Sequence, residues 1–154
     1  MVIDAVAKSG QRAILLEGDD LTANIQLPKN VFTIEWASFD WLFPRMTAVV
    51  HHGGLGTTHA ALKAGVPSVI VPCDEENYFW GNRLTEQGLS PPLIPQKQLS
   101  AEKLAEAIKM VIADEGIHQK VKEVSKRIQT EDGVTKAVEI FHQHLQNYEP
   151  ITIN

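Results

Sequence analysis

The apolar positions of the chain fall into short runs that alternate with segments of helical spacing. The short runs indicate strands at residues 12–18, 31–36, 47–52 and 67–72. Helical patterns occupy residues 1–10, 39–46, 57–67, 76–88 and 100–116. Two runs, RAILLEG and PSVIVP, are apolar without alternation, which is typical of strands buried on both faces. This order predicts an α/β fold in which a parallel sheet is flanked by helices.

Glycine, proline and serine mark the expected ends of several helices. Gly10, Gly65 and Gly88 each follow a helical pattern, where a C-cap takes a positive φ. Pro67 lies just beyond Gly65, so the third helix is expected to be short and sharply ended. Ser100 is expected to cap the helix that follows it.

The C-terminal third of the chain repeats one helical pattern three times. Apolar residues recur there at spacings of three and four. They are Leu104, Ile108, Val111 and Ile112, then Ile117, Val121, Val124 and Ile128, then Val134, Val138, Phe141 and Leu145. We therefore expect this third to be helical, within one domain over residues 1–147, followed by a flexible tail over residues 148–154.

Composition narrows the class of protein. The 154 residues are 44% apolar and 21% charged, which suits one globular domain and is too short for a large two-domain enzyme. The net charge is -5 and the 14 Lys and Arg are scattered, which argues against nucleic-acid binding. The lone Cys73 and the lack of a signal-peptide pattern favour a reducing, cytoplasmic setting. No apolar run approaches the ~20 residues of a membrane span.

The stretch HHGGLGTTHAALKAGVP, residues 51–67, has the character of an anion site. A strand, a tight glycine turn and a helix N-terminus present unpaired N–H groups and partial positive charge. Gly53, Gly54 and Gly56 allow a diphosphate to approach the backbone, and Thr57 and Thr58 add hydroxyl donors. The motif is neither a P-loop nor the dinucleotide fingerprint, and a plain glycine turn remains an alternative.

Polar residues follow the next predicted strand. Asp74, Glu75, Glu76 and Asn77 stand at its end and at the start of a helix, where carboxylate and amide groups can bind sugar hydroxyls. Capping of the helix is the alternative role for Glu76 and Asn77.

The histidines and the cysteine give weaker signals. His51 and His52 are adjacent on a strand and point to opposite faces, so a shared metal ion is not expected, even with His59 nearby. A packed His51 is favoured over a metal ligand. Cys73 is expected to line a core or pocket rather than act as a nucleophile.

The run DWLFPRMTAVVHHGGLGTTHAALKAGVPSVIVP, followed by FWGNRL, resembles the donor-binding half of GT-B glycosyltransferases. Within that class it is similar to sterol 3-β-glucosyltransferases and to glycosyltransferases of antibiotic biosynthesis. The resemblance covers roughly residues 30–112. It implies a Rossmann-like C-terminal domain that holds a nucleotide sugar, with UDP-glucose favoured, at a cleft facing an N-terminal acceptor domain.

The resemblance also implies roles for particular residues. His52 contacts the diphosphate, together with the backbone of Gly54, Leu55 and Gly56 and the Thr57 hydroxyl. Glu76 and Asn77 bind the sugar hydroxyls. Trp36 stacks on the base and Ala37 reads the uracil edge through its backbone, although Trp36 as a core aromatic remains an equal alternative. No cofactor, no metal and no catalytic residue is expected within this chain.

The implied activity is inverting, metal-independent transfer of a hexose to an acceptor hydroxyl. The resemblance assigns the general base and the acceptor site to an N-terminal domain, and the first strand of the donor domain is expected to be missing. The chain alone is therefore expected to be inactive. Three alternatives remain open. They are the donor-binding subunit of a two-chain glycosyltransferase, a sugar-nucleotide epimerase, and a non-catalytic interaction domain.

Overall fold

Strands and helices alternate through the first two thirds of the chain, as expected, and helices alone make up the last third. The computed structural model describes residues 1–16 and 27–146, so the tail expected over residues 148–154 lies outside the described residues. The strands are β1 (Ala13–Leu16), β2 (Val31–Ile34), β3 (Val49–His51) and β4 (Ser68–Ile70). The longer helices are α1 (Val2–Ser9), α3 (Leu55–Ala64), α4 (Glu75–Glu86), α5 (Ala101–Ala113), α6 (Glu115–Thr130) and α7 (Gly133–Gln146). The short ones are α2 (Phe39–Leu42), η1 (Phe43–Arg45) and η2 (Gln96–Gln98).

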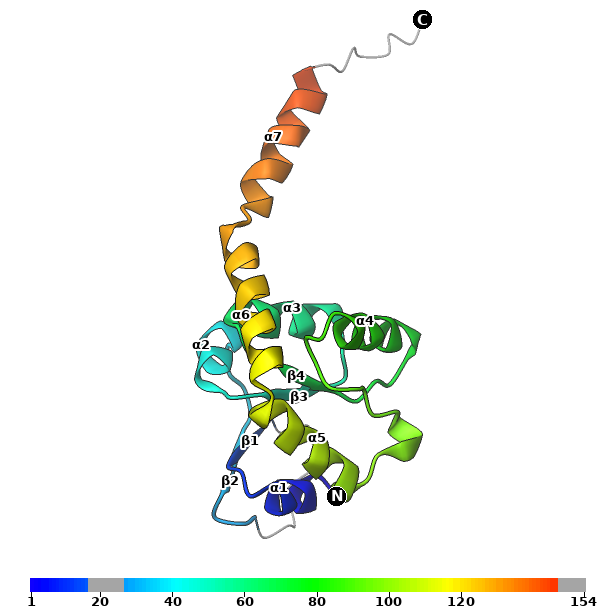
Figure 1. Cartoon of the computed structure of the whole chain (residues 1–154). Helices are drawn as coiled ribbons and strands as arrows, with labels where there is room; N and C mark the ends of the chain where they lie inside the picture. Colours follow the sequence, from blue (N-terminus) through cyan, green and yellow to red (C-terminus); the bar gives the residue numbers. More distant parts are fainter. Residues whose placement is uncertain (17–26, 147–154) are drawn as a thin grey trace, which may run out of the picture.

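The four described strands pair in parallel, as the alternation predicts. They form two separate pairs, β1 with β2 and β3 with β4. Figure 1 shows α3 and α4 on one side of the β3–β4 pair and α5 on the other. Because β3 and β4 run in the same direction, the residues after His51 and after Ile70 emerge at the same edge of the sheet.

The core lies around β4. Val69 and Ile70 are fully buried and belong to one apolar cluster with Leu104, Val111 and Val121 of α5 and α6. All three residues of β4 are buried, which confirms the expectation for PSVIVP. Burial of β4 fixes this strand, and the glycine turn follows its parallel partner β3.

Strand β1 departs from the sequence-based expectation. RAILLEG was predicted to be buried on both faces, but Ile14 is 39% exposed and Leu16 is 53% exposed. Exposed and half-buried residues alternate along the strand. The prediction was wrong because an apolar run cannot reveal whether a second layer covers the strand.

Caps set the helix ends. Gly10 and Gly65 take positive φ of 72° and 74° at the C-caps of α1 and α3, as expected. The Ser100 side chain accepts a hydrogen bond from the Lys103 N–H at the start of α5. The helix predicted from Thr57 begins instead at Leu55, two residues earlier.

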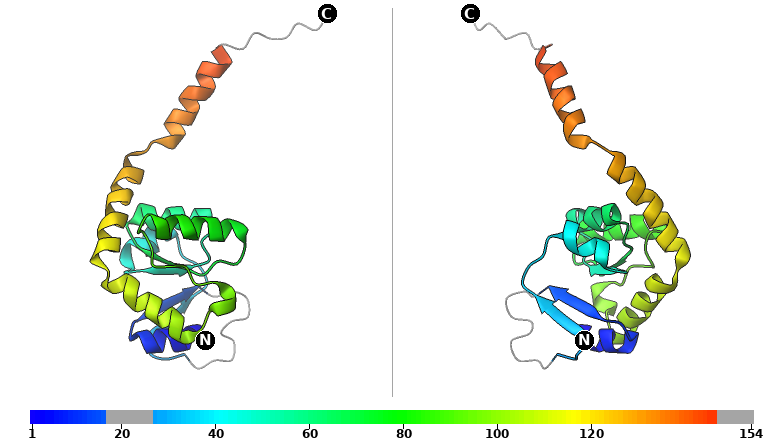
Figure 2. Two further views of the ribbon diagram at one scale, coloured as in Figure 1. Left: turned by 45° about the vertical axis from the view of Figure 1, so that its right-hand side comes forward. Right: turned by 90° about the vertical axis from the view of Figure 1, so that its left-hand side faces the viewer.

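Helix α7 extends away from the rest of the molecule (Figures 1 and 2). Its apolar residues are exposed: Val134 is 79%, Phe141 is 61% and Leu145 is 53% accessible. The expected helical spacing is confirmed, but the apolar face of α7 has no described element packed against it.

Candidate functional site

The glycine turn joins the end of β3 to the start of α3. Gly53 has a φ of 98°, and a Cβ there would lie 2.9 Å from Ile70 Cγ2 and 3.1 Å from the Asn77 carbonyl oxygen. Only glycine fits this position without strain, because both the backbone conformation and the space require it. The turn is therefore held close to β4 and to the start of α4.

The N-terminus of α3 has no side-chain cap. Gly54 occupies the N-cap position, and the first intrahelical bond runs from the Thr58 N–H to the Gly54 carbonyl over 3.0 Å. The N–H groups of Leu55, Gly56 and Thr57 precede that bond and have no intrahelical acceptor. A Cβ on Gly56 would meet nothing within 4 Å. These donors and the positive end of the helix dipole make a site suited to an anion.

His51 holds the turn in place. Its Nδ1 accepts a hydrogen bond of 3.0 Å from the Gly53 N–H, and its Nε2 lies 3.1 Å from the Ser68 Oγ. Because Nδ1 is the acceptor, the neutral ring carries its proton on Nε2 and donates to Ser68. Burial, with a smaller effect of the neighbouring His52, lowers the pKa of His51 from 6.5 to about 4. The ring is neutral at pH 7 and serves the turn rather than a ligand.

His52 lies on the other side of the strand and is exposed. The two imidazole rings are 6.3 Å apart and nearly perpendicular. A Cβ on Gly54 would lie only 2.5 Å from His52 Nε2, so the ring sits against the Gly54 backbone. The structure thus brings together His52, Gly54 and the first turn of α3, as the sequence predicts.

Asp74, rather than Glu76 or Asn77, caps α4. Its Oδ1 accepts a hydrogen bond of 2.9 Å from the Asn77 N–H. Glu76 is exposed, and Asn77 is 4% exposed with its carbonyl beside Gly53. Among the residues that the structure describes, none forms a hydrogen bond with the Asn77 side-chain amide. The side chains of Glu76 and Asn77 are therefore not committed to capping, and the Asn77 backbone lies next to the glycine turn.

Trp36 and Ala37 follow β2. Trp36 is 79% exposed, so the alternative of a core aromatic is wrong for this structure, and Ala37 is half-buried. β2 belongs to the other strand pair. The indole is accessible for stacking on a planar ligand.

The Thr58 hydroxyl does not lie with that of Thr57 at the start of α3, where both were expected. Thr57 is half-buried in the first turn of α3, whereas the Thr58 Oγ1 is buried and forms no hydrogen bond with any residue that the structure describes. Thr58 and His59 line a separate cavity of about 400 Å³ between α3, α4 and α6. The reason is the helix start: with α3 beginning at Leu55, Thr58 turns onto the face directed at α4 and α6.

Other candidate chemistry is limited within the described part of the chain. No group of three or more His, Cys, Asp or Glu residues there is arranged to hold a metal ion. Cys73 is exposed, so its expected place in the core is wrong, while the alternative of a pocket-lining thiol stays a prediction. None of the described helices is both long and apolar enough to cross a bilayer.

The sequence reasoning missed the role of His51 in holding the turn. A histidine two residues before Gly53 was the available signal, but its partner Ser68 is 17 positions away along the chain. Only the parallel pairing of β3 and β4 brings the two side chains together.

Two relatives and two solved structures that resemble this chain are all glycosyltransferases. A sterol 3-beta-glucosyltransferase of Arabidopsis thaliana is 42% identical over 98% of this chain, and one of Komagataella phaffii is 36% identical over 94% of it. The chain spans 25% and 12% of those proteins. The crystal structure of the glycosyltransferase VinC in complex with dTDP matches 96% of this chain and 37% of VinC, with a TM-score of 0.88 and 24% identity. The calicheamicin glycosyltransferase CalG4 matches 96% of this chain and 40% of CalG4, with a TM-score of 0.82 and 25% identity.

The family model for the C-terminal domain of erythromycin biosynthesis protein CIII-like proteins matches residues 1–141. The fold, with its parallel strand pairs and the helices around them, is that of the C-terminal domain of GT-B glycosyltransferases. The chain therefore belongs to the erythromycin biosynthesis protein CIII-like C-terminal domain family, within the GT-B glycosyltransferases.

Proposed function

We propose that this chain is the nucleotide-sugar-binding domain of an inverting, metal-independent glycosyltransferase. The donor is a UDP-hexose, and the sugar passes to an acceptor hydroxyl. The glycosyltransferase class rests on the family, whereas the donor, the stereochemistry and the lack of a metal rest on the resemblance of the glycine turn and its surroundings. The chain spans 37% of VinC, so we assign the acceptor site and the general base to a separate N-terminal domain.

The observation that carries the proposal is the uncapped start of α3. Three N–H groups, on Leu55, Gly56 and Thr57, open onto the edge of the sheet where the His52 ring sits against Gly54. Such a helix start binds phosphate oxygens through hydrogen bonds and the helix dipole. The diphosphate of the donor is the anion that we place there, with the Thr57 hydroxyl as a further donor.

These groups suit the chemistry of sugar transfer. The acceptor oxygen forms a bond to the anomeric carbon while the bond from that carbon to the diphosphate oxygen breaks, and the leaving diphosphate takes the electron pair. The acceptor proton passes to the general base. Because negative charge accumulates on the diphosphate in the transition state, donors fixed around it lower the barrier more than they strengthen ground-state binding.

Neighbouring residues supply the remaining contacts. Asn77 lies beside the turn and Glu76 precedes it in the first turn of α4, and we assign the sugar hydroxyls to the Glu76 carboxylate and the Asn77 amide. The exposed Trp36 can stack on the base, and the Ala37 backbone can read its edge. UDP-glucose is the favoured donor, and the names of the sterol 3-beta-glucosyltransferases among the relatives support a glucosyl group. The exposed thiol of Cys73 suits a reducing compartment such as the cytoplasm.

An amide NMR titration tests the proposal. The domain is titrated with UDP, UDP-glucose and dTDP, alongside the His52→Ala variant and the control His144→Ala, which removes an exposed histidine on α7. We expect saturable shifts over residues 52–58 with UDP and UDP-glucose. They should be weakened in His52→Ala and unchanged in His144→Ala.

The outcomes separate donor binding from the alternatives. Stronger binding of dTDP than of UDP would overturn the choice of nucleotide while keeping the site. No shifts at millimolar nucleotide, either in the domain or in the full-length enzyme, would contradict donor binding and favour a non-catalytic interaction domain.

A further inference from the structure

A second cavity lies at the opposite edge of the β3–β4 pair from the glycine turn. It has a volume of about 480 Å³ and is bounded by α6, by the segment before β3 and by the turn between α3 and β4. Thr47 and Pro67, which line it, stand just before β3 and β4, so the cavity is at the amino-terminal edge of both strands. Its volume is in the range of sites that bind small molecules.

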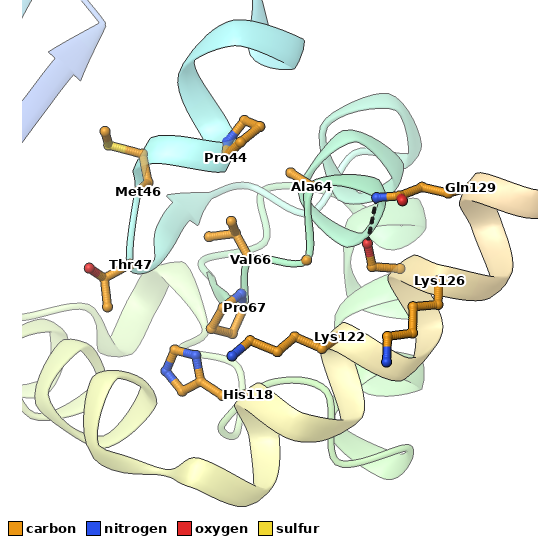
Figure 3. Close-up of a pocket in the computed structure, with 12 residues that line it drawn as sticks. Pro44, Met46, Thr47, Ala64, Val66, Pro67, His118, Lys122, Lys126 and Gln129 are labelled. Atoms are coloured by element: carbon orange, nitrogen blue, oxygen red, sulfur yellow. Dashed lines mark hydrogen bonds between the residues drawn. The ribbon is translucent and has the colours of Figure 1, made fainter.

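The ionisable residues that line this cavity are all potential cations. His118, Lys122 and Lys126 follow one another at intervals of four along α6, and no carboxylate contributes to the lining. Figure 3 shows the Lys122 side chain extending toward His118 and Pro67. Within the described residues, neither lysine ammonium forms a hydrogen bond or an ion pair. A concentrated positive surface in a chain of net charge -5 favours an anionic ligand.

Two features of the cavity are unfavourable when it is empty. Lys122 and Lys126 are like charges four positions apart on a helix, which repel each other. The Nε2 of His118 is buried with no hydrogen-bond partner among the described residues. A buried polar nitrogen without a partner destabilises the fold. An anion bound between the two ammonium groups would relieve their repulsion.

The walls of the cavity are already fixed. The Ser125 Oγ donates to the Lys63 carbonyl over 2.7 Å, and the Gln129 Nε2 donates to the same oxygen over 3.0 Å. These bonds hold α6 against the C-terminal end of α3. The lysines thus extend from a helix whose position is already fixed, so binding has to order only their side chains.

We propose that this cavity, lined by His118, Lys122 and Lys126, binds a phosphate group on the face of the domain opposite the donor turn. The Lys ammonium groups pair with the phosphate oxygens, since Lys binds phosphate well as a point charge. The His118 ring lies in the lining beside them. The competing explanation is that the lysines only stabilise α3, by interacting with the partial negative charge at its C-terminal end. The phosphate belongs either to a soluble phosphate ester or to a lipid headgroup.

The test is an NMR titration of the 154-residue chain with inorganic phosphate, compared with chloride at equal ionic strength. We expect phosphate to shift the amides of residues 118–126 and the His118 ring resonances, apart from any shifts at residues 52–58. In Lys122→Gln/Lys126→Gln the dissociation constant at α6 should rise at least about tenfold, because charge-assisted hydrogen bonds are lost. The control Lys109→Gln/Lys136→Gln, with the same change of charge on α5 and α7, should change it by about twofold or less.

The readouts also keep this site separate from the donor site. Shifts at residues 118–126 that match those of chloride, or that respond equally to both double variants, would overturn the proposal whatever occurs at residues 52–58. Circular dichroism checks that each variant is folded. Sedimentation with phosphatidylcholine vesicles containing phosphatidic acid then identifies the source. Pelleting that needs Lys122 and Lys126 supports a lipid headgroup, and phosphate binding without pelleting supports a soluble ester.

Discussion

The Gly53 N–H donates a hydrogen bond of 3.0 Å to His51 Nδ1, two residues earlier in the chain. The same ring lies 3.1 Å from the Ser68 Oγ on the neighbouring strand. One side chain thus connects the glycine turn to both strands of the β3–β4 pair. The turn owes its position to this half-buried histidine, while the exposed His52 remains available for a ligand.

Replacing His51 with Phe should destabilise the domain. The substitution keeps the ring volume but leaves the buried Gly53 N–H and Ser68 hydroxyl without a partner, which costs about 1–3 kcal/mol. Urea unfolding measures the change. Ser68→Ala is the control, because it removes the contact to Nε2 and keeps the bond to Gly53, so its loss should be smaller. Equal losses in the two variants would show that the bond to Gly53 contributes nothing.

The stability of the domain should fall as the pH is lowered through the range set by His51. Burial holds the pKa of His51 at about 4, below its ordinary 6.5, so the unfolded chain binds a proton in this range and the folded chain does not. The contribution of His51 to the free energy of unfolding is present in full above pH 6.5 and is lost progressively as the pH falls toward about 4. The loss amounts to roughly 3 kcal/mol, or 1.36 per pKa unit.

Urea unfolding of the wild type and of His51→Phe across this pH range isolates the effect. All other ionisable groups are the same in both proteins, so the difference in slope belongs to His51. Parallel pH profiles for the two proteins would mean that the folded ring protonates as easily as the unfolded one.

Two glycines of the turn should respond in opposite ways to alanine. Gly53→Ala places a Cβ against Ile70 and the Asn77 carbonyl at a φ of 98°, and we expect a loss of about 2 kcal/mol or more from strain and overpacking. Gly56→Ala meets open space within α3 and should stabilise the helix by up to about 1 kcal/mol. Its methyl group nevertheless stands where a diphosphate would approach. If Gly56→Ala keeps or raises the melting temperature but weakens UDP binding, Gly56 is needed for the approach of the diphosphate and not for folding.

Much of the fold could be predicted because its signals are local. Periodic apolar residues and the caps at Gly10, Gly65 and Ser100 mark the helices, and these were confirmed. The exposure of Leu16 on β1 was not predictable, since it depends on whether another layer covers the strand. The uncovered face of α7 escaped prediction for the same reason: a helical period identifies an apolar face without identifying what packs against it.

The candidate site, too, could be predicted from the sequence only in part. The place of the glycine turn, between the end of a strand and the start of a helix, followed from the order of strand, glycines and helix. The hydrogen bond between His51 and Ser68 could not be predicted, because it depends on the register of β3 and β4. The positions of the threonine hydroxyls depend on where α3 begins, and an uncapped start at Leu55 leaves no side-chain signal in the sequence.

Thr57 and Thr58 should therefore behave differently when each is replaced by Val. Thr57→Val removes a hydroxyl at the start of α3, and we expect weaker UDP binding with little change in stability. Thr58→Val exchanges a buried hydroxyl, unpaired within the described part of the chain, for a methyl group of similar shape. Relief of the unpaired hydroxyl should raise the free energy of unfolding by about 1 kcal/mol and leave UDP affinity unchanged. Urea unfolding and UDP titration on both variants measure the two effects. Weaker UDP binding in Thr58→Val would instead place that hydroxyl at the donor site, as the sequence alone predicts.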